Sequence, residues 1–326
     1  MKALVCDRLA PDLAGVGLRE IAVPALGPEE VLVRNRAACL NFPDLLMTEG
    51  KYQHRPAVPF TIGMESAGDV VEVGRAVKHV QPGERVIVGG KEGACAEYRV
   101  AAAAAVRPIP AGLDYAEGAA HTAGLLTAYV ALARLGDIAP GDTILVHGAA
   151  GGVGHAAVQL ARHRGAHVIA TSASAQKRDW LRAFAHHVLP PDENLRDAVL
   201  AIAPRGVDLC FDPVGGDVFD RSVRCMAFGS RYLVVGFTSG RIPEISVNYP
   251  LIKGFSIIGV RAGEYGRRFP QAGAENIAAI DAFAEAGLKP HIGASFDLTD
   301  GYQALHHLHS RKALGRVAIT MDHPVA

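Results

Sequence analysis

Apolar and polar positions along the first hundred residues form short runs of the length that β-strands have. Residues 31–34 follow a Gly-Pro turn at 27–30, residues 68–74 carry glycine at both ends, and residues 83–90 come directly after Pro82. Short strands separated by glycine and proline are typical of a barrel or a sandwich. The pattern therefore predicts a β-rich first part of the chain.

From about residue 123 the pattern changes to alternating strands and helices. The apolar run 143–147 predicts a strand, and residues 153–164 have the spacing of an amphipathic helix that ends at Gly165. Further apolar runs predict strands at 168–171, 207–212 and 232–236. Repeated strand–helix units imply a parallel sheet with helices on both faces. The tail begins with a helix-like segment at 276–286 and ends in an apolar run at 316–320.

The turn between the predicted strand 143–147 and the helix after it is rich in glycine. A glycine-rich turn at the start of a helix lets a pyrophosphate approach bare backbone and offers it free N–H groups at the positive end of the helix dipole. Ala149 stands where the G-x-G-x-x-G pattern has its first glycine, but strand, turn and helix lie in the required order. We therefore predict that a dinucleotide is bound by Gly148, Ala150, Gly151, Gly152, Val153 and Gly154.

The next predicted strand ends in a segment without carboxylates. Sites for NAD place an acidic residue about 20 residues beyond the glycine turn, where it binds the ribose 2′-hydroxyl. No Asp or Glu occurs here before Asp179, and hydroxyls and two cations occupy the segment instead. This composition favours a 2′-phosphate and hence NADP(H), with Thr171, Ser172, Ala173 and Lys177 as the predicted contacts. The alternative is that Lys177 and Arg178 form an ordinary solvated helix face.

Charge and cysteine content exclude several classes of protein. The chain has 33 basic and 33 acidic residues, so no overall positive field attracts it to nucleic acid or to an anionic membrane. Residues 118–133 are uncharged but shorter than the ~20 apolar residues of a membrane span. Asp7 and Arg8 interrupt any signal-peptide core, and the five cysteines form no C-x-x-C pair. We expect a cytoplasmic protein.

Several motifs together resemble the zinc-free quinone oxidoreductase branch of the medium-chain dehydrogenase/reductase superfamily. They lie at 41–46 with 50–52, 63–68, 147–154, 211–216 and 311–316. The resemblance covers nearly the whole chain. It implies an α/β fold in which a Rossmann-type doubly wound parallel sheet is inserted into a GroES-like β-barrel catalytic domain. The corresponding domain ranges are 1–122 and 263–326 for the catalytic domain and 123–262 for the NADP-binding domain.

The resemblance also shows where this chain departs from the zinc enzymes of the superfamily. Asn41 stands at the position of a ligand cysteine, and Met64 replaces the histidine of a Gly-His-Glu motif. Neither side chain suits Zn²⁺ as thiolate or imidazole does. The spacing of His306, His307 and His309 would scatter three rings over different faces of a helix. We therefore predict no metal site.

Without a metal to lower the pKa of a hydroxyl, reduction of an electron-poor acceptor is easier than oxidation of an alcohol. The resemblance implies an NADPH-dependent reductase whose acceptor is a quinone or an enone. It places Asn41, Asp44 and Tyr52 in the catalytic cleft, with Asn41 and Tyr52 as hydrogen-bond donors to the acceptor and Asp44 as an exposed, ionised organiser. It places Thr127 near the nicotinamide carboxamide, Phe237 on a loop beside the nicotinamide ring, and Arg311 at a C-terminal cofactor contact. Each of the two donors also has a purely structural alternative: Asn41 could shape the turn before Phe42, and Tyr52 could pack on the barrel.

Two departures within the branch affect the cofactor and the acceptor. No tyrosine precedes Pro190 and Pro191, where some relatives use one to cover the adenosine phosphate, and Leu46 replaces an aromatic residue of the cleft. An enoyl-thioester reductase remains an alternative that would need a cationic patch from Lys51, Arg55, Arg261, Arg267 and Arg268. A protein that binds NADPH without turnover is the second alternative.

The resemblance further implies a homodimer that forms between edge strands of two Rossmann sheets. The apolar segment 254–260 is the predicted edge. The alternative is that this segment is an interior strand or is covered by the tail.

Overall fold

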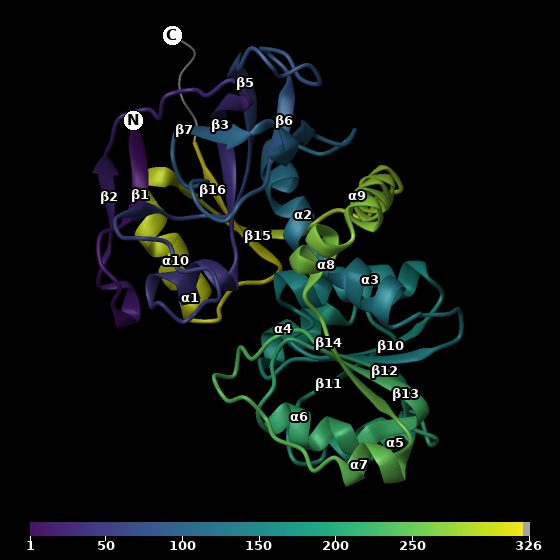
Figure 1. Cartoon of the computed structure of the whole chain (residues 1–326). Coiled ribbons are helices and arrows are strands. Elements are labelled where there is room, and N and C mark those ends of the chain that lie inside the picture. The colour runs from purple at the N-terminus through teal and green to yellow at the C-terminus, as the bar shows by residue number, and fades with distance from the viewer. Residues whose placement is uncertain (322–326) are drawn as a thin grey trace. The chain divides into compact units, whose positions relative to one another are not determined.

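A computed structural model describes residues 1–321 and divides into two compact units (Figure 1). The first unit contains Met1–Ala123 and the chain from Ala282 onward, and the second contains Gly124–Asp281. The first boundary lies within two residues of the one expected at 122/123. The return to the first unit comes at 282 rather than at 263.

The later return has a visible cause in the second unit. The chain from α2 (Tyr115–Tyr129) continues into a π-helical segment, η3 (Val130–Leu135). From η3, Arg134 donates to Asn276 Oδ1 and Glu275 Oε2, at 2.8 Å each. Both acceptors lie on α9 (Pro270–Glu285), and the Asn276 side chain is fully buried. These contacts hold most of α9 with the second unit.

The first unit is β-rich, as its pattern predicts. Its seven-stranded sheet has the order β15-β16-β3-β5-β6-β8 with β7 also paired to β3, and its three-stranded sheet has the order β2-β1-β4. The strands are β1 (Lys2–Cys6), β2 (Val16–Glu20), β3 (Glu30–Leu40), β4 (Phe60–Thr61), β5 (Glu65–Val73), β6 (Arg85–Val88), β7 (Tyr98–Ala102), β8 (Val106–Pro108), β15 (Ile292–Asp297) and β16 (Arg316–Thr320). Its further helices are α1 (Phe42–Thr48) and α10 (Gly301–His309).

Strand β3 is the centre of this unit. It pairs antiparallel with β5, with β7 and with the C-terminal strand β16, so one long strand joins the two ends of the chain. Val31 and Val33 alternate into an apolar core, in the two-residue period of a strand. Asn35 continues the buried face, and its amide donates to Ala94 O (3.1 Å) and Ala96 O (2.8 Å), which satisfies a polar group in the interior.

The second unit is a six-stranded parallel sheet of order β11-β10-β9-β12-β13-β14. Its strands are β9 (Thr143–Val146), β10 (His167–Thr171), β11 (His187–Leu189), β12 (Val207–Asp212), β13 (Met226–Val234) and β14 (Ser256–Gly259). Its helices include α3 (Gly152–His163), α4 (Ala175–Leu181), α5 (Leu195–Ile202), α6 (Asp217–Ser222), α7 (Asn248–Lys253) and α8 (Ala262–Arg268). In Figure 1, α3 lies on one side of this sheet and α5, α6 and α7 lie on the other.

The strand order of the second unit has a reversal between β9 and β12. From β9 the chain runs outward to β10 and β11, and it then returns to the other side of β9. In doubly wound sheets, ligands bind at the carboxyl ends of the strands beside such a reversal. The strand predicted at 254–260 is β14, which ends the sheet order. The prediction of an edge is confirmed, and an interior position is excluded.

An aromatic cluster joins helices α3 and α4 of the second unit. The His155 ring on α3 lies 4.7 Å from the ring of Trp180 on α4 and 4.7 Å from the ring of Phe184, centroid to centroid. Trp180 and Phe184 are also 4.7 Å apart. Trp180 is the single tryptophan of the chain.

In residues 1–321, no helix combines the length and the apolar character of a membrane span.

Candidate active site

The glycine turn lies between β9 and α3, at the sheet reversal. Gly148 has a φ of +56°, which favours glycine. A Cβ on Gly154 would lie 2.3 Å from Gly148 O, so only glycine lets the first turn of α3 approach the loop. Gly151 N–H donates to Gly148 O (2.9 Å), and Ala149 N–H donates to Thr171 O (3.1 Å). The six predicted residues of the turn therefore form one compact loop at the start of α3, the geometry that a dinucleotide phosphate requires.

The buried side chain of His147, directly before this loop, connects three segments of the second unit. His147 Nδ1 lies 2.8 Å from Thr171 Oγ1, and Nε2 lies 2.6 Å from Ser222 Oγ. The Ser222 hydroxyl donates its hydrogen to Val218 O (2.6 Å), so its oxygen must accept a hydrogen bond from His147 Nε2–H. Nδ1 of the neutral ring then accepts from the Thr171 hydroxyl. Burial lowers the pKa of His147 to about 4, so the ring is neutral. His147 thus ties β9, β10 and α6 together.

The sequence predicts no role for His147. It predicts Thr171 as a cofactor contact, and the structure directs the Thr171 hydroxyl to His147 inside the protein. The only available signal was a polar residue placed directly between an apolar strand and the glycine turn.

The segment after β10 is held in shape by its second cation. Arg178 Nη1 donates to Ser172 O (3.0 Å) and to Ala173 O (2.8 Å), and Ser174 Oγ accepts from Lys177 N–H at the start of α4. Arg178 therefore has a local structural function. The Lys177 side chain is partly buried, and this burial lowers the pKa of its ammonium group. An anionic ligand oxygen beside Lys177 would offset that desolvation.

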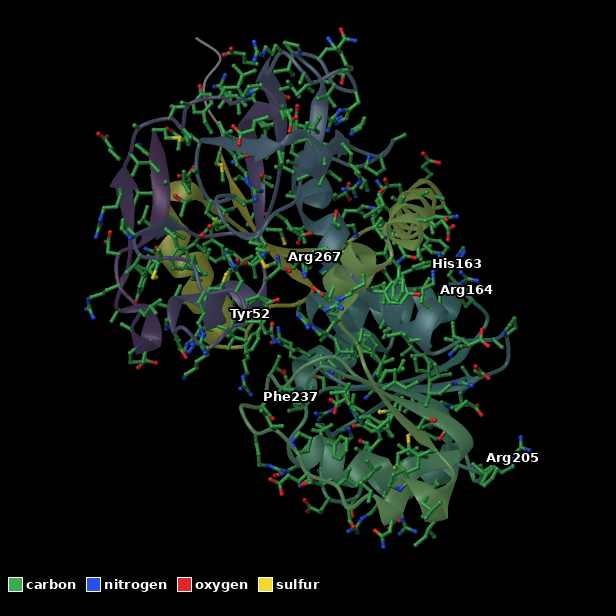
Figure 2. All side chains as sticks on the ribbon, viewed as in Figure 1. Tyr52, His163, Arg164, Arg205, Phe237 and Arg267 are labelled. Atoms are coloured by element: carbon green, nitrogen blue, oxygen red, sulfur yellow. The ribbon has the colours of Figure 1, made fainter. Side chains whose placement is uncertain are left out.

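The turn after β12 is organised by Asp212. Its Oδ1 accepts from Val214 N–H (2.8 Å) and Gly215 N–H (2.9 Å), and its Oδ2 accepts from Tyr232 Oη (2.8 Å). Phe237 lies on the loop after β13 and packs on this turn, because a Cβ on Gly215 would lie 2.8 Å from Phe237 Cδ1. Figure 2 labels Phe237 on this loop. The side chain is 38% exposed and thus available to a ligand.

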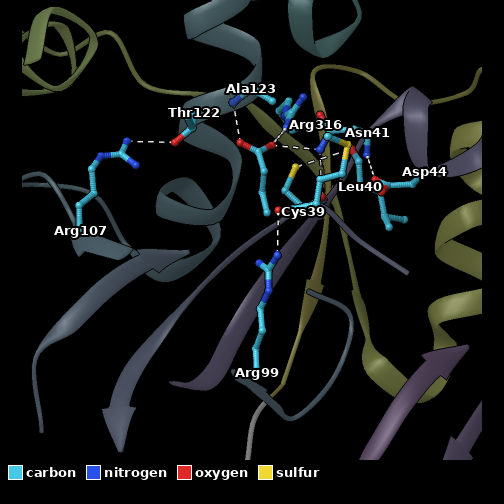
Figure 3. A network of polar contacts seen from close by, with 11 residues as sticks. Cys39, Leu40, Asn41, Asp44, Arg99, Arg107, Thr122, Ala123 and Arg316 are labelled. Atoms are coloured by element: carbon cyan, nitrogen blue, oxygen red, sulfur yellow. Dashed lines mark hydrogen bonds and ion pairs between the residues drawn. The ribbon is translucent and has the colours of Figure 1, made fainter. Parts of the chain in front are cut away.

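In the first unit, the buried carboxylate of Glu65 connects four segments of the chain (Figure 3). Glu65 Oε2 accepts from Asn41 Nδ2 (3.0 Å) and from Arg316 Nη2 (2.8 Å), and Oε1 accepts from Ala123 N–H (2.5 Å). Glu65 and Arg316 are each only 5% exposed. The pair joins β5 to β16, with α1 and α2 attached through Asn41 and Ala123. The sequence predicts no role for Glu65 or Arg316, which are 251 residues apart.

The same contacts restrict what Asn41 can do. Its Nδ2 group also donates to Cys39 O (3.3 Å), so both amide hydrogens have acceptors within the protein. The carboxylate of Glu65 requires a donor, which fixes the orientation of the amide. The resemblance implies that Asn41 donates a hydrogen bond to the oxygen of the substrate that accepts the hydride. In this structure, that donation would require one of the two internal hydrogen bonds to break.

Asp44 is buried, contrary to the expectation of an exposed carboxylate. Its side chain has no exposed area, and burial raises the pKa of Asp44 to about 7. Oδ2 accepts from Asn41 N–H (2.7 Å) at the start of α1. Oδ1 forms no hydrogen bond with residues 1–321. Asp44 thus caps the start of α1, and it is partly protonated at neutral pH.

The remaining predicted residues lie on both units. Tyr52 is partly buried and packs against the apolar core of the first unit that includes Leu45 and Met47 (Figure 2). Arg311 follows α10 with a left-handed φ of +57°, also in the first unit. Thr127 is on α2, in the part that belongs to the second unit. The first unit therefore contains Asn41, Asp44, Tyr52 and Arg311, and the second unit contains all the other predicted site residues.

The positions of zinc ligands in related enzymes are occupied here by other side chains. The Asn41 amide is bonded internally, and Met64 packs against the apolar core of the first unit. Within residues 1–321, no three His, Cys, Asp or Glu side chains are arranged to hold a metal ion. The three histidines of α10 therefore belong to no such group of ligands.

Comparisons with known proteins agree with this architecture. The family model described as Alcohol dehydrogenase GroES-like domain matches residues 27–136, and the one described as Zinc-binding dehydrogenase matches residues 152–279. The Quinone oxidoreductase-like protein 2 homolog of Nematostella vectensis is 35% identical over 98% of this chain and 88% of its own length. The mouse protein of the same name is 34% identical over 98% of this chain and 92% of its own length.

Solved structures show the same relationship. A probable oxidoreductase from Mycobacterium abscessus has a TM-score of 0.89 and 34% identity, with 98% of each chain covered. The Escherichia coli quinone oxidoreductase, solved in complex with NADPH, has a TM-score of 0.90 and 26% identity over 98% of this chain and all of its own. This chain belongs to the quinone oxidoreductase branch of the medium-chain dehydrogenase/reductase superfamily.

Proposed function

We propose that this protein is an NADPH-dependent, zinc-independent reductase that transfers hydride to quinones or α,β-unsaturated carbonyl compounds. The observation that carries the proposal is the glycine loop at the sheet reversal, followed by an acid-free segment with a partly buried Lys177. The required absence of a Cβ at Gly154 and the free start of α3 fit a pyrophosphate. Lys177 fits a ribose 2′-phosphate. Structures of related oxidoreductases with NADPH support the same cofactor.

When bound, NADPH supplies a hydride from C4 of its nicotinamide ring. A quinone that accepts this hydride together with one proton becomes a hydroquinone. An enone accepts the hydride at its β-carbon and a proton at its α-carbon, and becomes a saturated ketone. The protein has to orient the acceptor, exclude water and stabilise the oxygen on which negative charge develops.

Tyr52 is our candidate for the hydrogen-bond donor to that oxygen. A phenol donates while it remains neutral at pH 7. Asn41 is the weaker candidate, because Cys39 O and Glu65 accept both of its amide hydrogens. Asp44 contributes by fixing the start of α1. Zinc independence is supported by the internal bonding of Asn41 and the apolar setting of Met64.

Tyr52→Phe is expected to lower kcat for an enone by about 10²–10³-fold, the usual cost of one donor aimed at a developing oxyanion. The loss for a quinone should be much smaller, since an activated quinone needs little help. Steady-state NADPH oxidation with both acceptor classes measures the difference, with C4-deuterated NADPH to follow the label onto the enone carbon. An unchanged enone rate removes Tyr52 from the proposal, and an unlabelled product removes direct hydride transfer.

Elemental analysis should find no stoichiometric zinc in the active protein.

Two alternatives compete with this function. An enoyl-thioester reductase needs a cationic patch for a coenzyme A phosphate. Arg267 and Arg268 both bind Glu264 (3.0 and 2.9 Å), and Lys51 binds Glu49 (2.7 Å), so three of the five expected cations already have carboxylate partners. A protein that binds NADPH without turnover is the other alternative. A panel of quinones, enals and enoyl-thioesters separates the three.

Lys177→Ala is expected to weaken NADPH binding by about 1–3 kcal/mol, the range of a charge-assisted hydrogen bond, and to leave NADH binding unchanged. Fluorescence titration of both cofactors at one salt concentration measures the selectivity. Lys253→Ala, on α7, removes an equal charge without touching this segment and serves as the control. If NADH already binds the wild type as tightly as NADPH does, Lys177 does not recognise a 2′-phosphate.

We further propose a cytoplasmic homodimer. All five cysteines are buried and free of disulfides, as in proteins of a reducing compartment. Strand β14 leaves one edge of the parallel sheet unpaired by any strand of residues 1–321. Strongly exposed apolar side chains flank that edge: Phe228, Leu251 and Ile252, which are 88%, 81% and 73% exposed. A twofold pairing of β14 with its copy would cover both the edge and these side chains.

Ile257→Lys, in the middle of β14, is expected to convert the dimer to monomer by placing two charges beside the twofold axis. Light scattering at micromolar concentration measures the mass. Val71→Lys, which changes an exposed valine of the first unit, is the control and should leave the mass unchanged. A monomeric wild type, or a dimeric Ile257→Lys variant, contradicts this interface.

A further inference from the structure

The loop after β13 carries Phe237 and is bonded along its base. Thr238 N–H donates to Pro213 O (3.1 Å) and Ser239 N–H donates to Val214 O (2.9 Å), so the loop follows the turn after β12. Asp212 holds that turn from the inside. Phe237 therefore depends on two layers of contacts, both within the second unit.

Beyond Ser239 the apolar anchor of the loop is Ile245, which is partly buried and packs against the core of the second unit. Ile242 is 69% exposed and Val247 is 85% exposed, so neither packs into the core. Arg241 provides a different kind of fixation. Its Nη2 donates to Asp217 Oδ1 (3.0 Å) and also to Asp220 Oδ2. The two carboxylates lie one turn apart on α6, and one guanidinium bridges them.

The backbone of Arg241 is also linked to the part of the loop near Phe237. Arg241 N–H donates to Ser239 Oγ (3.3 Å), and a Cβ on Gly216 would lie 2.7 Å from that Oγ. Ser239 thus fills the space left by Gly216, and Arg241 holds the loop down on α6 beyond it. Arg241 thus ties the loop backbone to α6 through both ion pairs, in addition to the packing of Ile245.

We propose that Arg241 is a positioning residue that holds the Phe237 loop in its working position through the paired carboxylates of Asp217 and Asp220. The proposal rests on the proposed function, because Phe237 is expected beside the nicotinamide ring. It assigns Arg241 an effect on turnover and not on the binding of the adenosine half of NADPH, which lies with Lys177. It also makes turnover sensitive to salt, since the three side chains are partly exposed and their attraction is screened.

Arg241→Met is expected to lower kcat about three- to tenfold, the size that one or two partly exposed ion pairs supply. Binding of 2′,5′-ADP, a probe for the adenosine end, should change less than about twofold on the same scale. Arg241→Lys, which keeps the charge, should recover most of the activity. High NaCl should lower kcat of the wild type toward that of Arg241→Met and should scarcely affect the variant.

Arg19→Met is the matched control, because Arg19 forms a similar exposed pair with Asp7 in the first unit, whereas α6 and the loop belong to the second. Its kcat should equal that of the wild type. The proposal is overturned if Arg241→Met keeps wild-type kcat, if Arg241→Lys is as impaired as Arg241→Met, or if 2′,5′-ADP binding falls together with kcat. Failure of the wild type to bind 2′,5′-ADP or to oxidise NADPH contradicts the proposed function instead.

Discussion

Glu65→Gln is expected to lower the free energy of unfolding by about 3–5 kcal/mol, the usual result when one partner of a buried ion pair is removed. The substitution keeps the size of the side chain but leaves the Arg316 guanidinium as an uncompensated buried charge. It also places a new NH₂ group among donors, because Asn41, Ala123 and Arg316 all donate to the present carboxylate. Urea-induced unfolding followed by far-UV circular dichroism measures the change.

Two further variants test whether the buried charge is the cause. Glu264→Gln removes a carboxylate that pairs with Arg267 and Arg268 at the surface, and it should cost less than about 1 kcal/mol. Glu65→Leu combined with Arg316→Met removes both buried charges and should recover stability relative to Glu65→Gln. A loss below about 1 kcal/mol in Glu65→Gln would show that this carboxylate is not the centre of the network.

Gly154→Ala is expected to reduce NADPH affinity by at least about 100-fold, or ~2.7 kcal/mol. The new Cβ would lie 2.3 Å from Gly148 O and 2.9 Å from Ala149 Cα, and both are backbone atoms that no rotamer change can move. The loop itself must therefore shift, and with it the N–H groups offered to a pyrophosphate. Overpacking of this kind also destabilises the fold by about 1–3 kcal/mol.

Titration calorimetry with NADPH and a thermal melt measure the two effects of Gly154→Ala separately. Gly151→Ala is the control for folding, because its Cβ would lie 3.4 Å from Gly148 O at an ordinary φ of −85°. Its melting temperature should stay close to that of the wild type. Wild-type NADPH affinity in Gly154→Ala would mean that the loop does not hold the cofactor.

The features that depend on local sequence could be predicted. Strands β9, β10 and β12 and helix α3 lie within one or two residues of their predicted ranges. Short apolar runs specify the three strands, and apolar positions repeating every 3.6 residues specify the helix. The glycine turn is identified by its place between them. The edge position of β14 follows from the resemblance and is confirmed by the strand order.

The polar centre of the first unit could not be predicted, because it depends on contacts between distant parts of the chain. Asn41 meets Glu65 across 24 residues and Arg316 meets Glu65 across 251. Without these contacts, Asn41 looks like a free donor and Asp44 looks like an exposed carboxylate. The expectation that Asp44 is exposed is wrong, because the packing around α1 leaves no solvent at its side chain. The roles of Asn41, Asp44 and Tyr52 in the reaction stay predictions.

The single tryptophan gives this two-unit chain an optical label on one unit only. Trp180 lies in the second unit, in contact with His155 and Phe184, so its emission reports on the packing of α3 against α4. Far-UV circular dichroism, in contrast, reports on both units. Coincident melting curves from the two signals would mean that the units unfold as one cooperative body, and separate curves would mean that each has its own transition.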